Sequence, residues 1–144
     1  MGALRERPPL DISIVPDGKG AVGKTNFPDD CPPEFKNYLG TSREKQNYTE
    51  TRILIEVAGT IAHDTHAPSR AHDAGDAHDL QWARMIIDQN ASWAQDDREA
   101  YLQGLCDLAR TMIEANWAWV QAVARALVEQ RELTGADVTT CRPT

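Results

Sequence analysis

Hydrophobic residues recur every three or four positions through most of the chain after residue 48, which is the spacing of helices that bury one face. The pattern predicts helices over residues 49–62, from about 76 to 93, from 96 onward, and roughly over 117–131. Asp76 can cap the second, and Asp96 with Glu99 resembles a capping box for the third. The predicted buried stripes are Ile53, Leu54, Val57, Ala58 and Ile61; Leu80, Ala83, Ile86 and Ile87; Leu102, Leu105, Cys106, Ala109, Met112 and Ile113; and Val120, Val123 or Ala124, Leu127 and Val128.

The segment before these helices predicts a β-hairpin. Residues 11–15, DISIV, form the first arm, residues 17–20 the turn, and residues 22–27 the returning arm. Residues 28–48 and the His-rich residues 64–75 predict loops, and residues 134–137, TGAD, indicate a short final turn. We therefore expect a mainly α fold, a bundle of about four helices preceded by one β-hairpin. It forms a single domain over residues 11–138, with residues 1–10 a remnant or linker and 139–144 a tail.

The hairpin turn also contains a nucleotide-binding pattern. GKGAVGKT, residues 18–25, fits the P-loop pattern G-x-x-x-x-G-K-[ST]. A P-loop requires a helix that begins at the Lys, but Pro28, Pro32 and Pro33 follow closely and would break such a helix. No convincing strand pattern follows Phe27 to build a parallel sheet. The context therefore favours a hairpin over a nucleotide site.

Composition narrows the classes of partner. A formal net charge of −7 argues against binding to nucleic acid or to anionic membranes, because both partners require a basic face on the protein. The three cysteines, Cys31, Cys106 and Cys141, are far apart and lack C-x-x-C spacing, so we expect free thiols in a reducing cytoplasm. The chain shows neither the apolar core of a signal peptide nor a stretch long enough to cross a bilayer, which predicts a soluble protein.

Four segments occur in a specific order along the chain. The first is a strand with a V-P-x-G-like turn and a return strand. A helix and the start of a second helix follow. The last segment is a closing helix, a stretch similar to the pattern L-x-x-R-x-L-[ST]-G, and a short last helix. The four segments are ISIVPDGKGAVGKTNF (12–27), ILIEVAGTIAHD (53–64), AGDAHDL (74–80) and WAWVQAVARALVEQRELTGADV (117–138). In this order they resemble the peptidase domain of FtsH-type zinc metalloproteases, and more closely its stand-alone bacterial relatives without the ATPase module.

That family uses two zinc-binding histidines one helical turn apart, a Glu between them as general base, and a distant Asp as third ligand. The resemblance implies that Asp79, in AGDAHDL, occupies the third-ligand position. The His-Glu-x-x-His helix is expected upstream of the hairpin, where this chain has only MGALRERPPL, and the motif occurs nowhere in the sequence. We therefore expect no catalytic residue in this chain and zinc only in a longer form. MGALRERPPL cannot cover the apolar surface that the missing helix would cover. This favours a truncated or misread start over a pseudoenzyme.

The histidines offer a weaker metal hypothesis. His63, His66, His72 and His78 alternate with aspartates around the loop over residues 64–75. His63, His66 and His78 are alternative metal ligands, although a solvated polar loop explains the same pattern. His63 also stands where the relatives usually carry Glu. For Asp79 the simpler explanation is that carboxylates are favoured in the first turn of any helix.

Two further features have competing explanations. The tryptophans Trp82, Trp93, Trp117 and Trp119 are expected in the core or at its rim rather than around a ligand. The returning arm of the hairpin, which includes Lys24, Thr25, Asn26 and Phe27, is either an ordinary edge or, as the resemblance implies, an edge to which an extended polypeptide adds. The competing functions are thus an incomplete FtsH-like zinc metallopeptidase domain and a non-catalytic module that binds a peptide or partner protein. Oligomerisation stays open.

Overall fold

The computed structural model describes residues 11–16, 24–26, 43–68, 74–94 and 97–144. It is mainly helical and contains a small three-stranded antiparallel sheet, which confirms the predicted fold class. Among the described residues, those within Cys31–Ile113 form one compact unit, and those within Gly2–Asp30 and Glu114–Thr144 form a second. The prediction of one domain over residues 11–138 stays a prediction.

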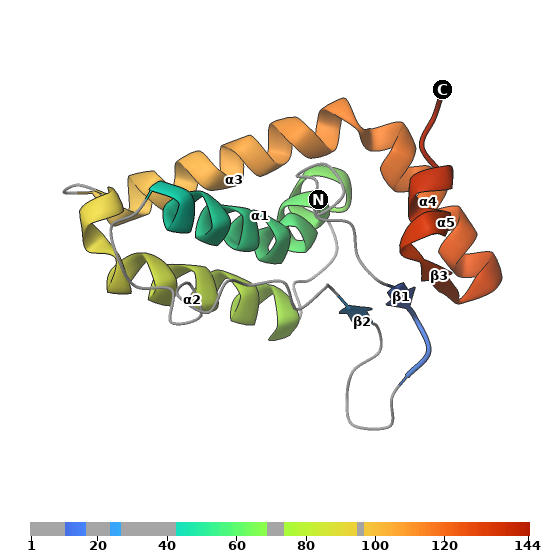
Figure 1. Cartoon of the computed structure of the whole chain (residues 1–144), viewed down its shortest axis with the longest axis horizontal. Coiled ribbons are helices and arrows are strands. Elements are labelled where there is room, and N and C mark those ends of the chain that lie inside the picture. Colours follow the sequence, from blue (N-terminus) through green and yellow to red (C-terminus); the bar gives the residue numbers. More distant parts are fainter. Residues whose placement is uncertain (1–10, 17–23, 27–42, 69–73, 95–96) are drawn as a thin grey trace. The chain divides into compact units, whose positions relative to one another are not determined.

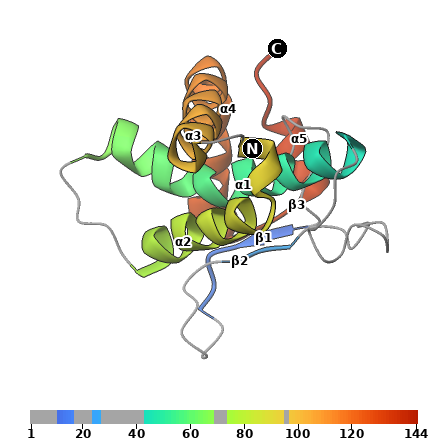
Figure 2. The same ribbon diagram turned by 90° about the vertical axis from the view of Figure 1, so that its left-hand side faces the viewer.

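The first unit contains three long helices and one 3-10 turn, with α1 lying between α2 and α3 (Figures 1 and 2). These elements are α1 (Arg43–His66), α2 (Ala74–Gln89), η3 (Ala91–Ala94) and α3 (Arg98–Ala115), the last of which ends in the second unit. The three predicted stripes are buried, except that Ala58, Leu80 and Met112 are half-buried. The stripes therefore form the core of this unit.

Several boundaries differ from the sequence prediction. Residues 43–48 and 64–66, predicted as loop, belong to α1. Lys45 and Thr49 are buried in its first turns, so a polar sequence without an apolar stripe is helical here because of its packing. The second helix ends at Gln89, before η3, rather than near Trp93. The carboxylate of Asp97 accepts the backbone N–H of Ala100 at 2.9 Å, so Asp97 caps α3, whereas the predicted cap, Asp96, lies outside the described residues.

A polar network joins α1 to α3. The Tyr101 hydroxyl donates to the Glu50 carboxylate, and Gln46 Nε2 donates to that hydroxyl at 3.2 Å and to Glu50 Oε1 at 3.1 Å. Burial, and then the hydrogen bond to Glu50, raises the pKa of Tyr101 above its usual range. The network therefore holds a neutral tyrosine between the two helices.

The second unit is built around the sheet. Its elements are β1 (Asp11–Ser13), β2 (Lys24–Asn26), α4 (Trp117–Gln130), β3 (Glu132–Thr134) and α5 (Gly135–Thr140). The strand order is β2-β1-β3, and both pairings are antiparallel. The predicted hairpin is confirmed as β1 and β2, while its turn lies outside the described residues. The third strand, β3, was not predicted, because three residues between two helices are too few to show an alternation of apolar and polar positions.

The core of this unit centres on Trp119. Its ring packs with Leu133 and Val138, and its Nε1 donates to the Val138 carbonyl at 2.8 Å. The predicted stripe of α4 is wrong at Val128, which is 73% exposed. Of the alternatives Val123 and Ala124, Val123 packs against this core. The buried residue of the helix is Trp119. The short final turn is confirmed as α5. Within the described ranges, no helix combines the length and apolarity needed to cross a membrane.

Candidate functional site

Strand β2 lies at an edge of the sheet. It pairs with β1 on one side, and within the described part of the chain no strand pairs with its other side. Lys24, Thr25 and Asn26, predicted as part of a peptide-binding edge, form this strand, and Phe27 lies outside the described residues. Thr25 is exposed and Asn26 half-buried. The structure thus places three of the four predicted residues together on one edge.

The hydrogen bonding of β1 fixes which backbone groups of β2 face outward. The Ile14 N–H donates to the Arg131 carbonyl, on the β3 side, at 2.9 Å. Because bonded and non-bonded pairs alternate along antiparallel strands, the backbone N–H and C=O of Ile12 also point to β3. Those of Asp11 and Ser13 point to β2. Asp11 lies opposite Asn26 and Ser13 opposite Lys24.

Thr25, between these two bonded pairs, therefore directs its backbone N–H and C=O to the outer side of β2. An unpaired N–H and C=O on a sheet edge is a template for another strand. This position also argues against a nucleotide site at the P-loop pattern, because Lys24 and Thr25 lie in a strand and not at the start of a helix.

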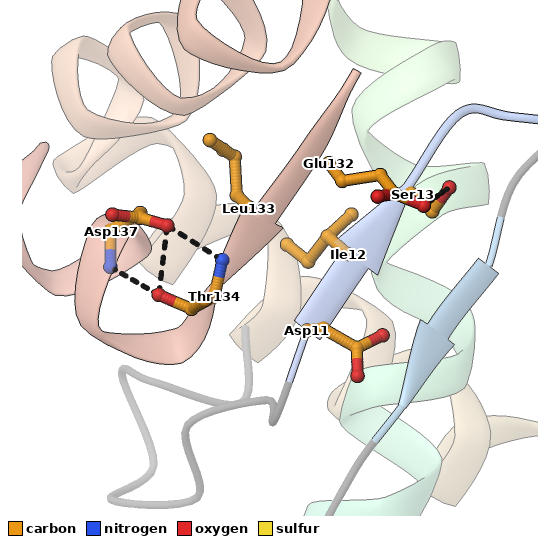
Figure 3. Close-up of a pocket in the computed structure, with 7 residues that line it drawn as sticks. All are labelled: Asp11, Ile12, Ser13, Glu132, Leu133, Thr134 and Asp137. Atoms are coloured by element: carbon orange, nitrogen blue, oxygen red, sulfur yellow. Dashed lines mark hydrogen bonds between the residues drawn. The ribbon is translucent and has the colours of Figure 1, made fainter. Parts of the chain in front are cut away.

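Side chains of the sheet surround a hollow between β1, β3 and α5 (Figure 3). Its volume is about 380 Å³, and it is lined by Asp11, Ile12, Ser13, Glu132, Leu133, Thr134 and Asp137. Three of these residues carry carboxylates, and each accepts a hydrogen bond: Asp137 caps α5, and Glu132 accepts the Ser13 hydroxyl at 3.4 Å. The Asp11 carboxylate accepts Asn26 Nδ2 at 2.6 Å, and Figure 3 shows it pointing from β1 toward β2.

The predicted metal ligands lie in the first unit. His63 and His66 are at the end of α1, half-buried and exposed respectively, and His72 lies outside the described residues. In α2, the side chain of His78 is 77% exposed and that of Asp79 31% exposed, with 3.7 Å between His78 Nδ1 and Asp79 Oδ1. Within the described ranges, no three His, Cys, Asp or Glu side chains come together to hold a metal ion.

Sequence reasoning did not single out Glu56, which lies in α1. Burial raises the pKa of Glu56, the ion pair with Arg52 at 3.2 Å counteracts this, and the charge of Asp79 raises the pKa further while His78 lowers it. Glu56 therefore lies within electrostatic range of Asp79, the family-implied ligand. The available signal was a carboxylate inside the apolar run ILIEVAG.

The tryptophans fit the predicted role. Trp119 is buried, and Trp82, Trp93 and Trp117 are half-buried, as expected for a core and its rim. None of them lines the hollow.

Comparison with models of known protein families and with curated proteins finds no match for the chain. The geometry of the β2 edge and of the region around Asp79, together with the resemblance described above, is therefore the basis for assigning a function.

Proposed function

We propose that this chain is an FtsH-type peptidase-like domain whose residues bind an extended polypeptide along β2. The observation that carries the proposal is the outward N–H and C=O of Thr25, an exposed residue of the edge strand β2. A peptide that adds as a fourth strand bonds to both groups, in the recognition mode known as β-augmentation. The order of hairpin, long helices and capped final helix also supports the resemblance.

The free thiols agree with a protein that works in the cytoplasm. Cys106 is buried, Cys141 is half-buried, and neither forms a disulfide. Burial raises the pKa of the Cys106 thiol, which keeps it protonated and unreactive. We include this compartment in the proposal.

Removing one backbone donor tests the binding role. Thr25→Pro removes the outward N–H of β2 and leaves the bonds to β1 in place, since proline is tolerated on an edge strand when its nitrogen faces outward. The probe is a fluorescein-labelled heptapeptide of alternating Thr and Val, and the readout is fluorescence anisotropy. We expect Thr25→Pro to weaken binding about fivefold or more, as the loss of one hydrogen bond requires.

Thr25→Ala is the matched control, because it removes the side chain and keeps the backbone donor. We expect it to bind within about twofold of the original chain. Equal binding by Thr25→Pro and the original chain, with both folded by circular dichroism, overturns the proposal.

A second candidate is zinc peptidase activity in a longer form of the protein, with Asp79 as the third ligand. The half-buried position of Asp79 beside His78 and near Glu56 favours this role. The described residues alone do not fit a zinc site, so the two histidines and the catalytic Glu would come from additional residues.

The test of this candidate is the intact mass of the protein from its natural source, with metal content measured on the same sample. A longer chain with about one zinc per molecule supports the peptidase role. A metal-free chain with the mass of these 144 residues leaves the binding role alone.

A further inference from the structure

Asp11 and Asn26 share one face of the sheet, next to the proposed binding edge. Side chains of paired residues point to the same face, and faces alternate along a strand. Ile12 and Leu133 are paired and turn toward the Trp119 core, so Asp11 and its partner Asn26 lie on the opposite face. The residue of β3 paired with Asp11, Thr134, has its hydroxyl engaged with Asp137.

The Asp11 carboxylate has a neutral partner. It accepts Asn26 Nδ2 at 2.6 Å. A carboxylate accepts about four hydrogen bonds, so acceptor sites remain after the bond from Asn26. Because Asn26 is in β2, this bond also holds the carboxylate on the side of the sheet that faces the binding edge.

A peptide paired with Thr25 brings its next residue opposite Asn26. Residues in such non-bonded pairs have their Cα atoms about 4.5 Å apart and their side chains close together. Asp11 is one strand further, at roughly twice the strand spacing of about 4.8 Å. An Arg side chain that extends over Asn26 meets the Asp11 carboxylate, which leans toward it, and can form the bidentate pair that guanidinium favours.

We propose that Asp11 makes the β2 edge selective for extended polypeptides that carry Arg opposite Asn26. This inference rests on the proposed binding at β2. Asp11 is then the specificity-determining residue, and Asn26 positions its carboxylate. The formal net charge of −7 of the chain favours the approach of such basic segments.

The experiment compares two labelled heptapeptides of alternating Thr and Val that carry either Arg or the neutral analogue citrulline at the fifth position. With the original chain, we expect the Arg peptide to bind about two- to fivefold more tightly, as is typical of one partly exposed ion pair. The preference disappears with Asp11→Asn, whose side-chain oxygen still accepts the bond from Asn26. It persists with Glu132→Gln, the control carboxylate on β3.

Each failure has its own signature. Equal binding of the two peptides to the original chain, when Thr25→Pro still weakens both, overturns the role of Asp11 and leaves binding at β2 intact. A preference for Arg that survives Asp11→Asn also overturns it and assigns the effect to net charge. Peptide binding that Thr25→Pro does not change overturns the binding site itself.

Discussion

At the residue scale, the side chain with the clearest electrostatic role is Asp137. Its carboxylate accepts the backbone N–H and the hydroxyl of Thr134, each at 2.8 Å, and the Thr134 hydroxyl accepts the Asp137 N–H at 3.2 Å. The backbone bond first, and then the hydroxyl bond, lowers the pKa of Asp137 below its ordinary value of 3.8. The charged carboxylate is therefore favoured in the folded protein.

This shift predicts a pH-dependent stability. Because the pKa is lower in the folded state, the stabilisation is complete above the unfolded value of 3.8 and is lost as the pH falls through the lowered value. We expect Asp137→Asn to have a lower urea midpoint than the original chain at neutral pH. The difference should shrink in acid, as measured by urea titrations across that pH range. A difference that stays constant into strong acid would contradict this prediction.

Residues with local interactions were the ones that sequence reasoning found. The start of α5 was predicted from TGAD because a capping box involves only residues three apart. Glu56 was missed because its raised pKa comes from burial and from the charge of Asp79, which lies on a different helix. The outward direction of Thr25 was likewise hidden, since the pairing of β1 with β3 determines it.

At the scale of elements, the end of α4 carries a strained residue. Arg131 caps the helix with φ of 67°, in the left-handed region, and its N–H donates to the Leu127 carbonyl. This conformation costs a non-glycine residue about 1–2 kcal/mol. Glycine avoids that cost, but its greater freedom in the unfolded chain offsets part of the stabilisation. We expect Arg131→Gly to raise the free energy of unfolding by about 0.5–1 kcal/mol, measured by urea titration.

The matched variant is Arg131→Ala, which removes the same side chain but keeps a Cβ at the strained position. We expect no gain from it. Equal stabilisation by both variants would show that the arginine side chain, and not the backbone angle, was unfavourable.

Two other elements show why sequence alone is insufficient. The apolar run of α4 permits several choices of buried face, and the observed one is set by Trp119, whose indole donates to the Val138 carbonyl. Strand β3 exists because its three residues pair with β1. In both cases, contacts distant in sequence select among local alternatives. The predicted stripes of α1 to α3 could be found because apolar residues recur there every three or four positions, as from Ile53 to Ile61 in α1.

At the scale of the whole molecule, each compact unit has a core of its own. The first is built from the stripes of α1, α2 and α3, and the second from Trp119, Leu133 and Val138. Compact units with separate cores commonly open as separate cooperative blocks in hydrogen exchange. We therefore expect a core substitution to affect mainly the unit that contains it.

Trp119→Phe tests this expectation. It keeps an aromatic ring beneath the Arg142 guanidinium, which lies 5.1 Å from the ring centroid, but removes the donor to the Val138 carbonyl. A buried carbonyl left without its donor costs about 1–3 kcal/mol. Amide exchange followed by NMR should therefore accelerate about five- to a hundredfold in α4 and β3 and stay unchanged in α1 to α3.

Ile87→Val, a buried substitution in α2 that costs about 0.5–1.5 kcal/mol, is the reciprocal control and should accelerate exchange in α1 to α3 alone. If either variant accelerates exchange equally in both units, the molecule opens as one cooperative block. Peptide binding at β2 would then be coupled to the stability of α1 and α2. If each variant accelerates exchange only in its own unit, the stability of the edge strand β2 and that of the region around Asp79 depend on different cores.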